Sequence, residues 1–176
     1  MIGILLRHFN INSINEFGET PLMLAAAHGK EAAVLMLLQK GADPHLEDPY
    51  GQHLLHFAAE DGNEHILKKV LSLEDVNVNK RNCVGVTPLA IAALYGKQRA
   101  FELLLENEAN PFLTIKDGYS VLHFAASGGS VPIISKLISL GLDKNLKDPL
   151  GKIPLIHAAE DNRHEAIRYL LLIEAK

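Results

Sequence analysis

The chain of 176 residues contains no tryptophan, one cysteine and few aromatic side chains. Because Cys83 stands alone, an intramolecular disulfide and a cysteine-based metal site are excluded, and we expect a reducing compartment, the cytoplasm or alternatively the nucleus. No apolar run approaches the roughly 18 residues that a membrane-spanning helix needs, so we expect no membrane insertion of this segment. The net charge of -4 offers no basic stripe, so we expect no nucleic-acid partner.

What the chain does contain is a glycine that recurs with a nearly constant period. The recurring residues are Gly18, Gly51, Gly85, Gly118 and Gly151, separated by 33, 34, 33 and 33 residues. After Gly18 the chain reads Thr-Pro-Leu at 20–22, Ala-Ala at 25–26 and glycine at 29, and the other copies follow this template. A period near 33 predicts stacked units that cannot bury their apolar faces alone, and therefore a solenoid.

The template resembles the ankyrin repeat, in which a turn and two antiparallel helices are built around Thr-Pro-Leu-His-x-Ala. The resemblance implies an all-α solenoid of helix-turn-helix units with projecting β-hairpin turns. We treat 1–176 as a single array, with an incoming half repeat at 1–14 followed by repeats at 15–47, 48–81, 82–114, 115–147 and 148–176.

Each unit carries its own helix signals. Thr20 can cap the first helix and Pro21 suits its first position, whereas the second repeat has His53 and Leu54 there and lacks both devices. The predicted helix stops are Gly29, Gly62, Gly96, Gly129 and Asn162. We place the extra residue of the second interval within 73–77.

The core is expected to form from two sets of apolar residues. Alanine pairs at 25–26, 58–59, 92–93, 125–126 and 158–159 keep the first helices thin enough to pack closely. The second helices bury one stripe, formed by Val34, Leu37, Leu38, Ala100, Leu104, Leu105, Ile134, Leu137, Ile138, Ile167, Leu170 and Leu171.

Both ends of the array look incomplete by sequence. Ile153, Ile156 and Ile173 do not give the last unit the polar outer face that a terminal repeat needs. We expect a fragment of a longer protein, and self-association or a natural short form would also account for these residues.

A search for reactive groups identifies no catalytic residue, no metal site and no cofactor site. The resemblance implies that His56 and His123 bind backbone of the neighbouring hairpin. His53 lies three residues before His56 but has no third metal ligand nearby. Cys83 has no defined base, which favours a plain surface thiol, and we expect the chain not to be an enzyme.

The resemblance further implies a concave ligand face, formed by the hairpin tips and the exposed ends of the first helices. We call it the hairpin face. The partner-binding residues expected there are Phe17, Tyr50, Glu60, Asp61, Val84, Leu94, Tyr95, Lys116, Tyr119, Leu150, Glu160 and Asp161. We expect Tyr50, Tyr95 and Tyr119 to form an aromatic row that anchors the partner, while Tyr169 lies on the opposite side.

Ankyrin arrays of animal cells also resemble substrates of an asparaginyl hydroxylase that modifies hairpin asparagines preceded by leucine at eight residues. Asn79 with Leu71 and Asn145 with Leu137 fit this spacing. Both asparagines are therefore possible hydroxylation sites if the source is an animal.

These features together predict a non-catalytic protein–protein interaction module, monomeric in isolation, whose partner presents basic and apolar residues. Two alternatives remain open. The chain could be a regulatory or positioning segment of a larger enzyme, channel or receptor, or a stand-alone inhibitor that binds an enzyme.

Overall fold

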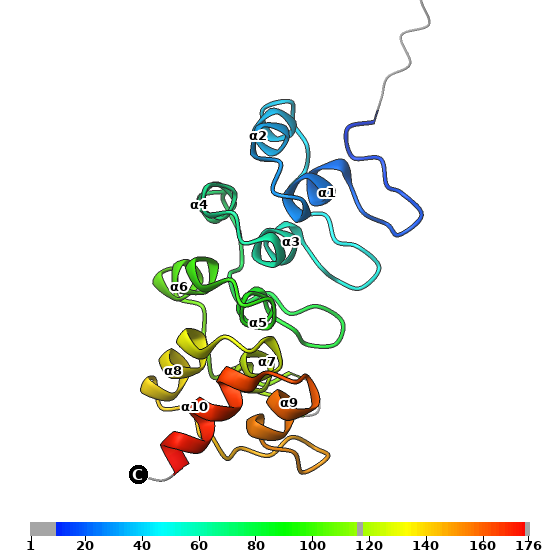
Figure 1. Ribbon diagram of the computed structural model, residues 1–176. Coiled ribbons are helices and arrows are strands. Elements are labelled where there is room, and N and C mark those ends of the chain that lie inside the picture. Colours follow the sequence, from blue (N-terminus) through cyan, green and yellow to red (C-terminus); the bar gives the residue numbers. More distant parts are fainter. Residues whose placement is uncertain (1–9, 116–117, 175–176) are drawn as a thin grey trace, which may run out of the picture.

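The computed structural model describes residues 10–115 and 118–174, and within them the chain folds into ten α-helices. In chain order these are α1 (Pro21–Ala27), α2 (Glu31–Gln39), α3 (Leu54–Asp61), α4 (Glu64–Leu71), α5 (Pro88–Leu94), α6 (Gln98–Glu106), α7 (Val121–Gly128), α8 (Val131–Ser139), α9 (Pro154–Glu160) and α10 (His164–Glu174). They form five consecutive pairs that stack side by side (Figure 1). The expected all-α solenoid is confirmed.

The helices make two layers. The odd-numbered helices contact one another in series from α1 to α9, and the even-numbered helices form the second layer from α2 to α10. Loops between successive repeats project beyond the odd-numbered layer, away from the even-numbered one (Figure 1). We call the outer surface of the even-numbered layer the back face. Among the described residues, strand pairing is limited to one isolated bridge between Glu47 and His53, so the hairpins form no sheet.

Helix starts follow the predicted signals. The Thr20 hydroxyl accepts a hydrogen bond from the Met23 amide at 3.2 Å, and Pro21 occupies the first position of α1. Thr87 caps α5 in the same way. In the second repeat His53 stands at this position without a hydroxyl group, and its ring forms a reciprocal capping box with His56.

Helix stops are also confirmed. The residues predicted to end the first helices all adopt positive φ, from 58° to 83°, at Gly29, Gly62, Gly96, Gly129 and Asn162. A second left-handed residue follows each of the helices α2, α6 and α8 by two positions, at Gly41, Glu108 and Gly141. After α4 the corresponding residue is Asp75, which lies further from the helix end, and this agrees with an extra residue near 73–77.

Burial follows the predicted stripes except at the last repeat. The alanine pairs of the first four repeats are buried, and so are Leu104, Leu137 and Leu170. Ala159 is exposed, and Leu171 is 50% exposed where a core position was expected. The expectation for Leu171 is wrong because no further helix pair in the described chain covers α10. Most of the predicted half repeat at 1–14 lies outside the described residues.

A close approach between the third and fourth repeats is made at a glycine. A Cβ on Gly128 would lie 2.3 Å from the Leu94 carbonyl oxygen and 2.6 Å from that of Ala93. Gly128 therefore lets the end of α7 pack directly against the backbone of α5.

Candidate functional site: the hairpin face

Four of the projecting loops are built around an Asn or Asp side chain. The Asp48 Oδ1 atom accepts hydrogen bonds from the amides of Tyr50 and Gln52 at 2.9 and 2.8 Å. Asn15, Asn82 and Asp148 bind the amides two and four residues ahead in the same way. This side chain replaces the hydrogen bonds that the loop backbone cannot make to itself, so each loop has a defined shape.

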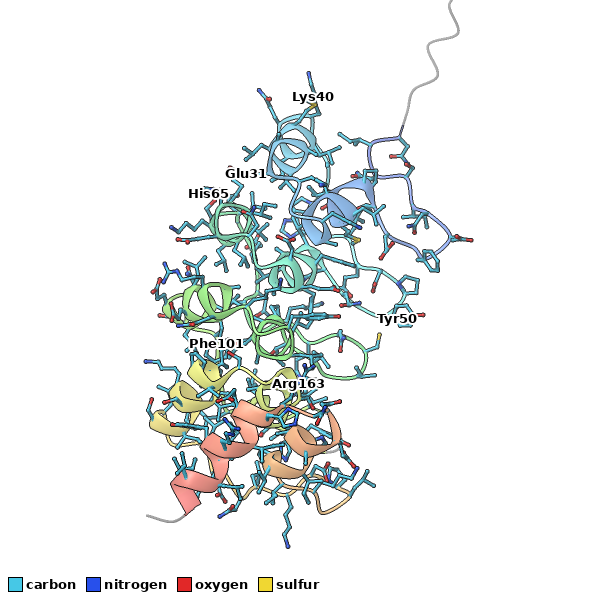
Figure 2. The ribbon with its side chains drawn as sticks, in the orientation of Figure 1. Glu31, Lys40, Tyr50, His65, Phe101 and Arg163 are labelled. Atoms are coloured by element: carbon cyan, nitrogen blue, oxygen red, sulfur yellow. The ribbon has the colours of Figure 1, made fainter. Side chains whose placement is uncertain are left out.

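The same geometry places one apolar residue at the tip of each of these loops. It lies two residues after the Asn or Asp and directly before the recurring glycine. We call these four the tip residues: Phe17, Tyr50, Val84 and Leu150, exposed by 60%, 65%, 58% and 72%. Figure 2 shows Tyr50 on its loop, well away from the helices. Sequence reasoning predicted all four as partner-binding residues, but it missed the Asn/Asp signal that places them together.

Neighbouring loops also support one another. The Cys83 amide donates to the Tyr50 carbonyl oxygen at 2.8 Å. A Cβ on Gly18 would lie 2.3 Å from Pro49 Cδ, so the first two loops are in direct contact. The first three loops therefore form a connected surface whose shape is set before any partner binds, which reduces the entropy lost on binding.

The expected aromatic row is not present as such. Tyr50 lies in the loop before α3, whereas Tyr95 follows the last residue of α5 and is 52% exposed. A seven-residue helix rises by about 10 Å, so these two rings lie at different levels of the hairpin face. Partial burial and then the nearby Glu60 carboxylate raise the pKa of Tyr95.

Tyr119 does not project into solvent as predicted. Its ring is half-buried and packs edge-on against His157, His123 and Phe124, with centroids 5.6, 5.9 and 6.5 Å away. Leu94 is half-buried as well, and it lines a cavity of about 110 Å³ together with this cluster. These residues shape the floor of the hairpin face.

The charged residues predicted for this face differ in their availability. Asp161 is exposed, while Glu60 and Asp61 are half-buried. The Glu160 carboxylate already pairs with Lys152 at 2.5 Å. Lys116, the remaining predicted member, lies outside the described residues.

The two histidines of the template have the structural role that the resemblance implies. His56 Nε2 donates to the Val86 carbonyl oxygen at 3.2 Å, and His123 Nε2 donates to those of Leu146 and Lys152 at 3.1 and 3.3 Å. Burial, followed by the neighbouring His53, lowers the pKa of His56 to about 4. His56 is therefore neutral at physiological pH and links its helix to the next hairpin.

This assignment also determines the state of His53. Because His56 Nε2 donates, its Nδ1 atom is the acceptor for the His53 backbone amide at 3.2 Å and for His53 Nδ1 at 2.7 Å. His53 Nε2 is then an acceptor, and it is buried without a hydrogen-bond partner among the described residues. The second repeat therefore carries a local polar defect in place of the usual cap.

The two asparagines of the hydroxylation motif differ. The Asn79 side chain bridges two repeats, since its Nδ2 donates to the Glu108 carbonyl oxygen at 3.2 Å and its Oδ1 accepts from the Asn110 amide at 2.7 Å. Asn145 is exposed, and its backbone amide donates a hydrogen bond to Asp143 Oδ1. Hydroxylation of either residue stays a prediction.

Within residues 10–115 and 118–174, no helix has both the length and the apolar character required to cross a membrane. The same part of the chain holds no group of three or more His, Cys, Asp or Glu side chains placed to bind a metal ion.

Comparison with known proteins agrees with a repeat-based interaction scaffold. The family model described as ankyrin repeats (3 copies) matches residues 33–117 and 107–176, and the model described as ankyrin repeats (many copies) matches residues 5–58. The chain belongs to the ankyrin repeat family, whose members mediate protein–protein interaction.

Several much longer proteins contain a similar segment. Rabankyrin-5 of Homo sapiens is 30% identical over 162 residues, which cover 90% of this chain and 14% of that protein. Transient receptor potential cation channel subfamily A member 1 of Homo sapiens is 31% identical over 170 residues, 93% of this chain and 15% of the channel. Neurogenic locus notch homolog protein 1 of Xenopus tropicalis is 28% identical over 147 residues, which cover 84% of this chain and 6% of that protein. The chain thus spans a small part of each relative.

Proposed function

We propose that the chain is a non-catalytic module that binds a protein partner through the hairpin face. The observation that carries this proposal is the set of four tip residues, each more than half exposed and each held by an Asn or Asp side chain. Leaving such apolar groups in water at four equivalent positions is unfavourable unless a partner covers them. The lone cysteine suits a reducing compartment, the cytoplasm or the nucleus.

The partner is expected to present apolar side chains to the tips and basic groups nearby. Asp161 is exposed and Glu60 lies beside the exposed ring of Tyr95, so the hairpin face carries negative charge next to apolar surface. Complementary positive charge on the partner would speed association and orient it.

A second candidate function is a regulatory or positioning segment within a larger protein. The observation in its favour is that similar segments make up only 6–15% of the three relatives above, one of which is a cation channel. Both candidates use the same surface, so they differ in what the rest of the protein does.

The test is affinity capture with the whole chain, identification of the bound protein, and measurement of its affinity for variants. Tyr50→Ala and Leu150→Ala should each weaken binding by about 2 kcal/mol, as expected for exposed apolar anchors that the partner buries. Tyr95→Ala should have a smaller effect because Tyr95 lies at another level of the face.

Met36→Ala is the matched control, since Met36 is 62% exposed but lies on α2. Its affinity should equal that of the unmodified chain, with the fold of every variant verified by circular dichroism. Equal affinities for Tyr50→Ala, Leu150→Ala and Met36→Ala would move the binding site away from the hairpin face.

A further inference from the structure

The back face carries two grooves in equivalent places, two repeats apart. One, of about 550 Å³, lies between α2 and α4, and the other, of about 450 Å³, lies between α6 and α8. Four pairs of lining residues are identical and 67 positions apart: Leu38 and Leu105, Pro44 and Pro111, Lys69 and Lys136, and Leu73 and Leu140. The two grooves are therefore copies of one structure, and any difference between them stands out.

The two grooves differ in the acidic and aromatic side chains that line them. The groove between α6 and α8 is lined by Glu102 and Glu106, at the positions that Leu35 and Gln39 occupy in the other groove. It is also lined by Phe112, which is 60% exposed. We call the α6–α8 groove the acidic groove and the α2–α4 groove the control groove.

Within the acidic groove, the two carboxylates are not equally available. Glu102 accepts hydrogen bonds from Arg99 at 2.7 Å and from Gln98 at 2.9 Å. Glu106 is exposed and makes no ion pair with the described part of the chain. It is thus the group that can take a cation from outside.

The end of α6 strengthens this preference for a cation. Glu106 is the last residue of the helix, where the helix dipole places partial negative charge, and the last turn of α6 contains no basic residue. The equivalent helix of the control groove, α2, also has no basic residue in its last turn, but it ends at the uncharged Gln39. Among the described residues that line the acidic groove, Lys136 is the one cation against two carboxylates, which gives this lining a net charge of -1.

We propose that the acidic groove binds a segment of a second protein that carries a bulky apolar side chain and, about one helical turn away, an arginine or lysine. The apolar side chain covers Phe112 and Leu140, which are 60% and 38% exposed, and the cation pairs with Glu106 at the end of α6. Because these walls are exposed side chains, the occupant lies along a shallow groove and is not enclosed by it.

This inference is independent of the proposed function of the hairpin face. The acidic groove lies on the even-numbered layer, and the hairpin loops project beyond the odd-numbered layer (Figure 1). Both surfaces can be occupied at the same time, so the chain can hold two protein segments on opposite sides.

The test uses ¹⁵N-labelled whole chain and two designed helical peptides in an alanine and glutamine host. One peptide carries leucine and arginine four positions apart, which places them on the same helical face, and the other carries glutamate in place of the arginine. The arginine peptide should cause saturable shifts at the amides of 105–110, 112 and 136–140. The glutamate peptide should bind more weakly.

Two variants test the named contacts. Phe112→Ala should weaken binding of the arginine peptide by about fivefold through lost apolar contact. Leu140→Ala repeats this test on the α8 side of the groove. Glu106→Gln should remove the preference for arginine over glutamate. The matched controls are Gln39→Ala, which lines the control groove, and His45→Ala, which lies 67 residues before Phe112, and both should leave the affinity unchanged.

Absence of saturable shifts at millimolar arginine peptide would overturn the proposal. Shifts that are equally large in the control groove, or that lie on the hairpin face, would also overturn it, as would equal binding of the two peptides.

Discussion

The third and fifth repeats share the same template but differ in how much they bury. In α5 the residues Pro88–Ala93 are all buried, whereas in α9 only Pro154 and Ala158 are buried. Helix α5 packs between α3 and α7, while α9 contacts α7 and α10. Burial in a solenoid is therefore decided by the neighbouring repeat as much as by the residue itself.

The largest effect that we expect from this difference in burial appears when two leucines are compared. Leu104 is fully buried between repeats, so Leu104→Ala should lower the free energy of unfolding by about 2 to 5 kcal/mol through lost contact and a cavity. Leu171 is 50% exposed, so Leu171→Ala should change it by less than about 0.5 kcal/mol. Denaturant unfolding measures both, and equal losses would contradict the assigned burial.

A smaller effect is expected at the close contact between α7 and α5. An added methyl group at Gly128 meets backbone oxygen atoms that cannot move alone, so Gly128→Ala should destabilise by about 1 to 3 kcal/mol. Alanine usually stabilises a helix relative to glycine, so a loss of stability on Gly128→Ala is the opposite of the usual effect.

The control for Gly128 is the equivalent position of the fifth repeat, Asp161, which is exposed. Asp161→Ala should leave the midpoint of denaturation nearly unchanged. A neutral or stabilising Gly128→Ala would mean that α7 and α5 do not approach as closely as described.

The smallest expected effect concerns the second repeat. In the fourth repeat the Ser120 hydroxyl lies 2.8 Å from His123 Nδ1, and His53→Thr should restore this arrangement next to His56. It also removes the buried, unpaired His53 Nε2, so stability should rise by about 1 kcal/mol.

Adding Leu54→Pro should contribute less than its place in the template suggests, because the Leu54 side chain is 2% exposed and its burial would be lost. Thermal and denaturant unfolding of the single and double variants separate the contribution of His53→Thr to stability from that of Leu54→Pro. A fall in stability for His53→Thr would show that the pair of histidine rings is worth more than a cap.

The sequence carried most of the fold because its signals are local and repeated. Thr20, Pro21 and Gly29 each act within one helix, so their roles follow from spacing alone. The exposure of Leu171 could not be read in this way, because it depends on whether another unit packs against α10.

The site was predictable in part for the same reason. Tyr50 projects because Asp48, two residues earlier, shapes its loop, and this signal was present in the sequence. Tyr119 follows its recurring glycine, whereas Tyr50 precedes its own, and the Tyr119 ring packs against His157, which is 38 residues away in the chain. The acidic groove likewise brings Glu106, Phe112 and Leu140 together from separate segments. Contacts of this kind require the stacked structure.

Hydrogen exchange of the whole chain, with and without its captured partner, tests the role of the hairpin face most directly. The non-proline amides of the tip loops at 15–19, 48–52, 82–86 and 148–152 should gain protection when the partner binds. Protection confined to the even-numbered helices, with the tip loops exchanging as in the free chain, would contradict the assignment of the hairpin face as the partner-binding surface.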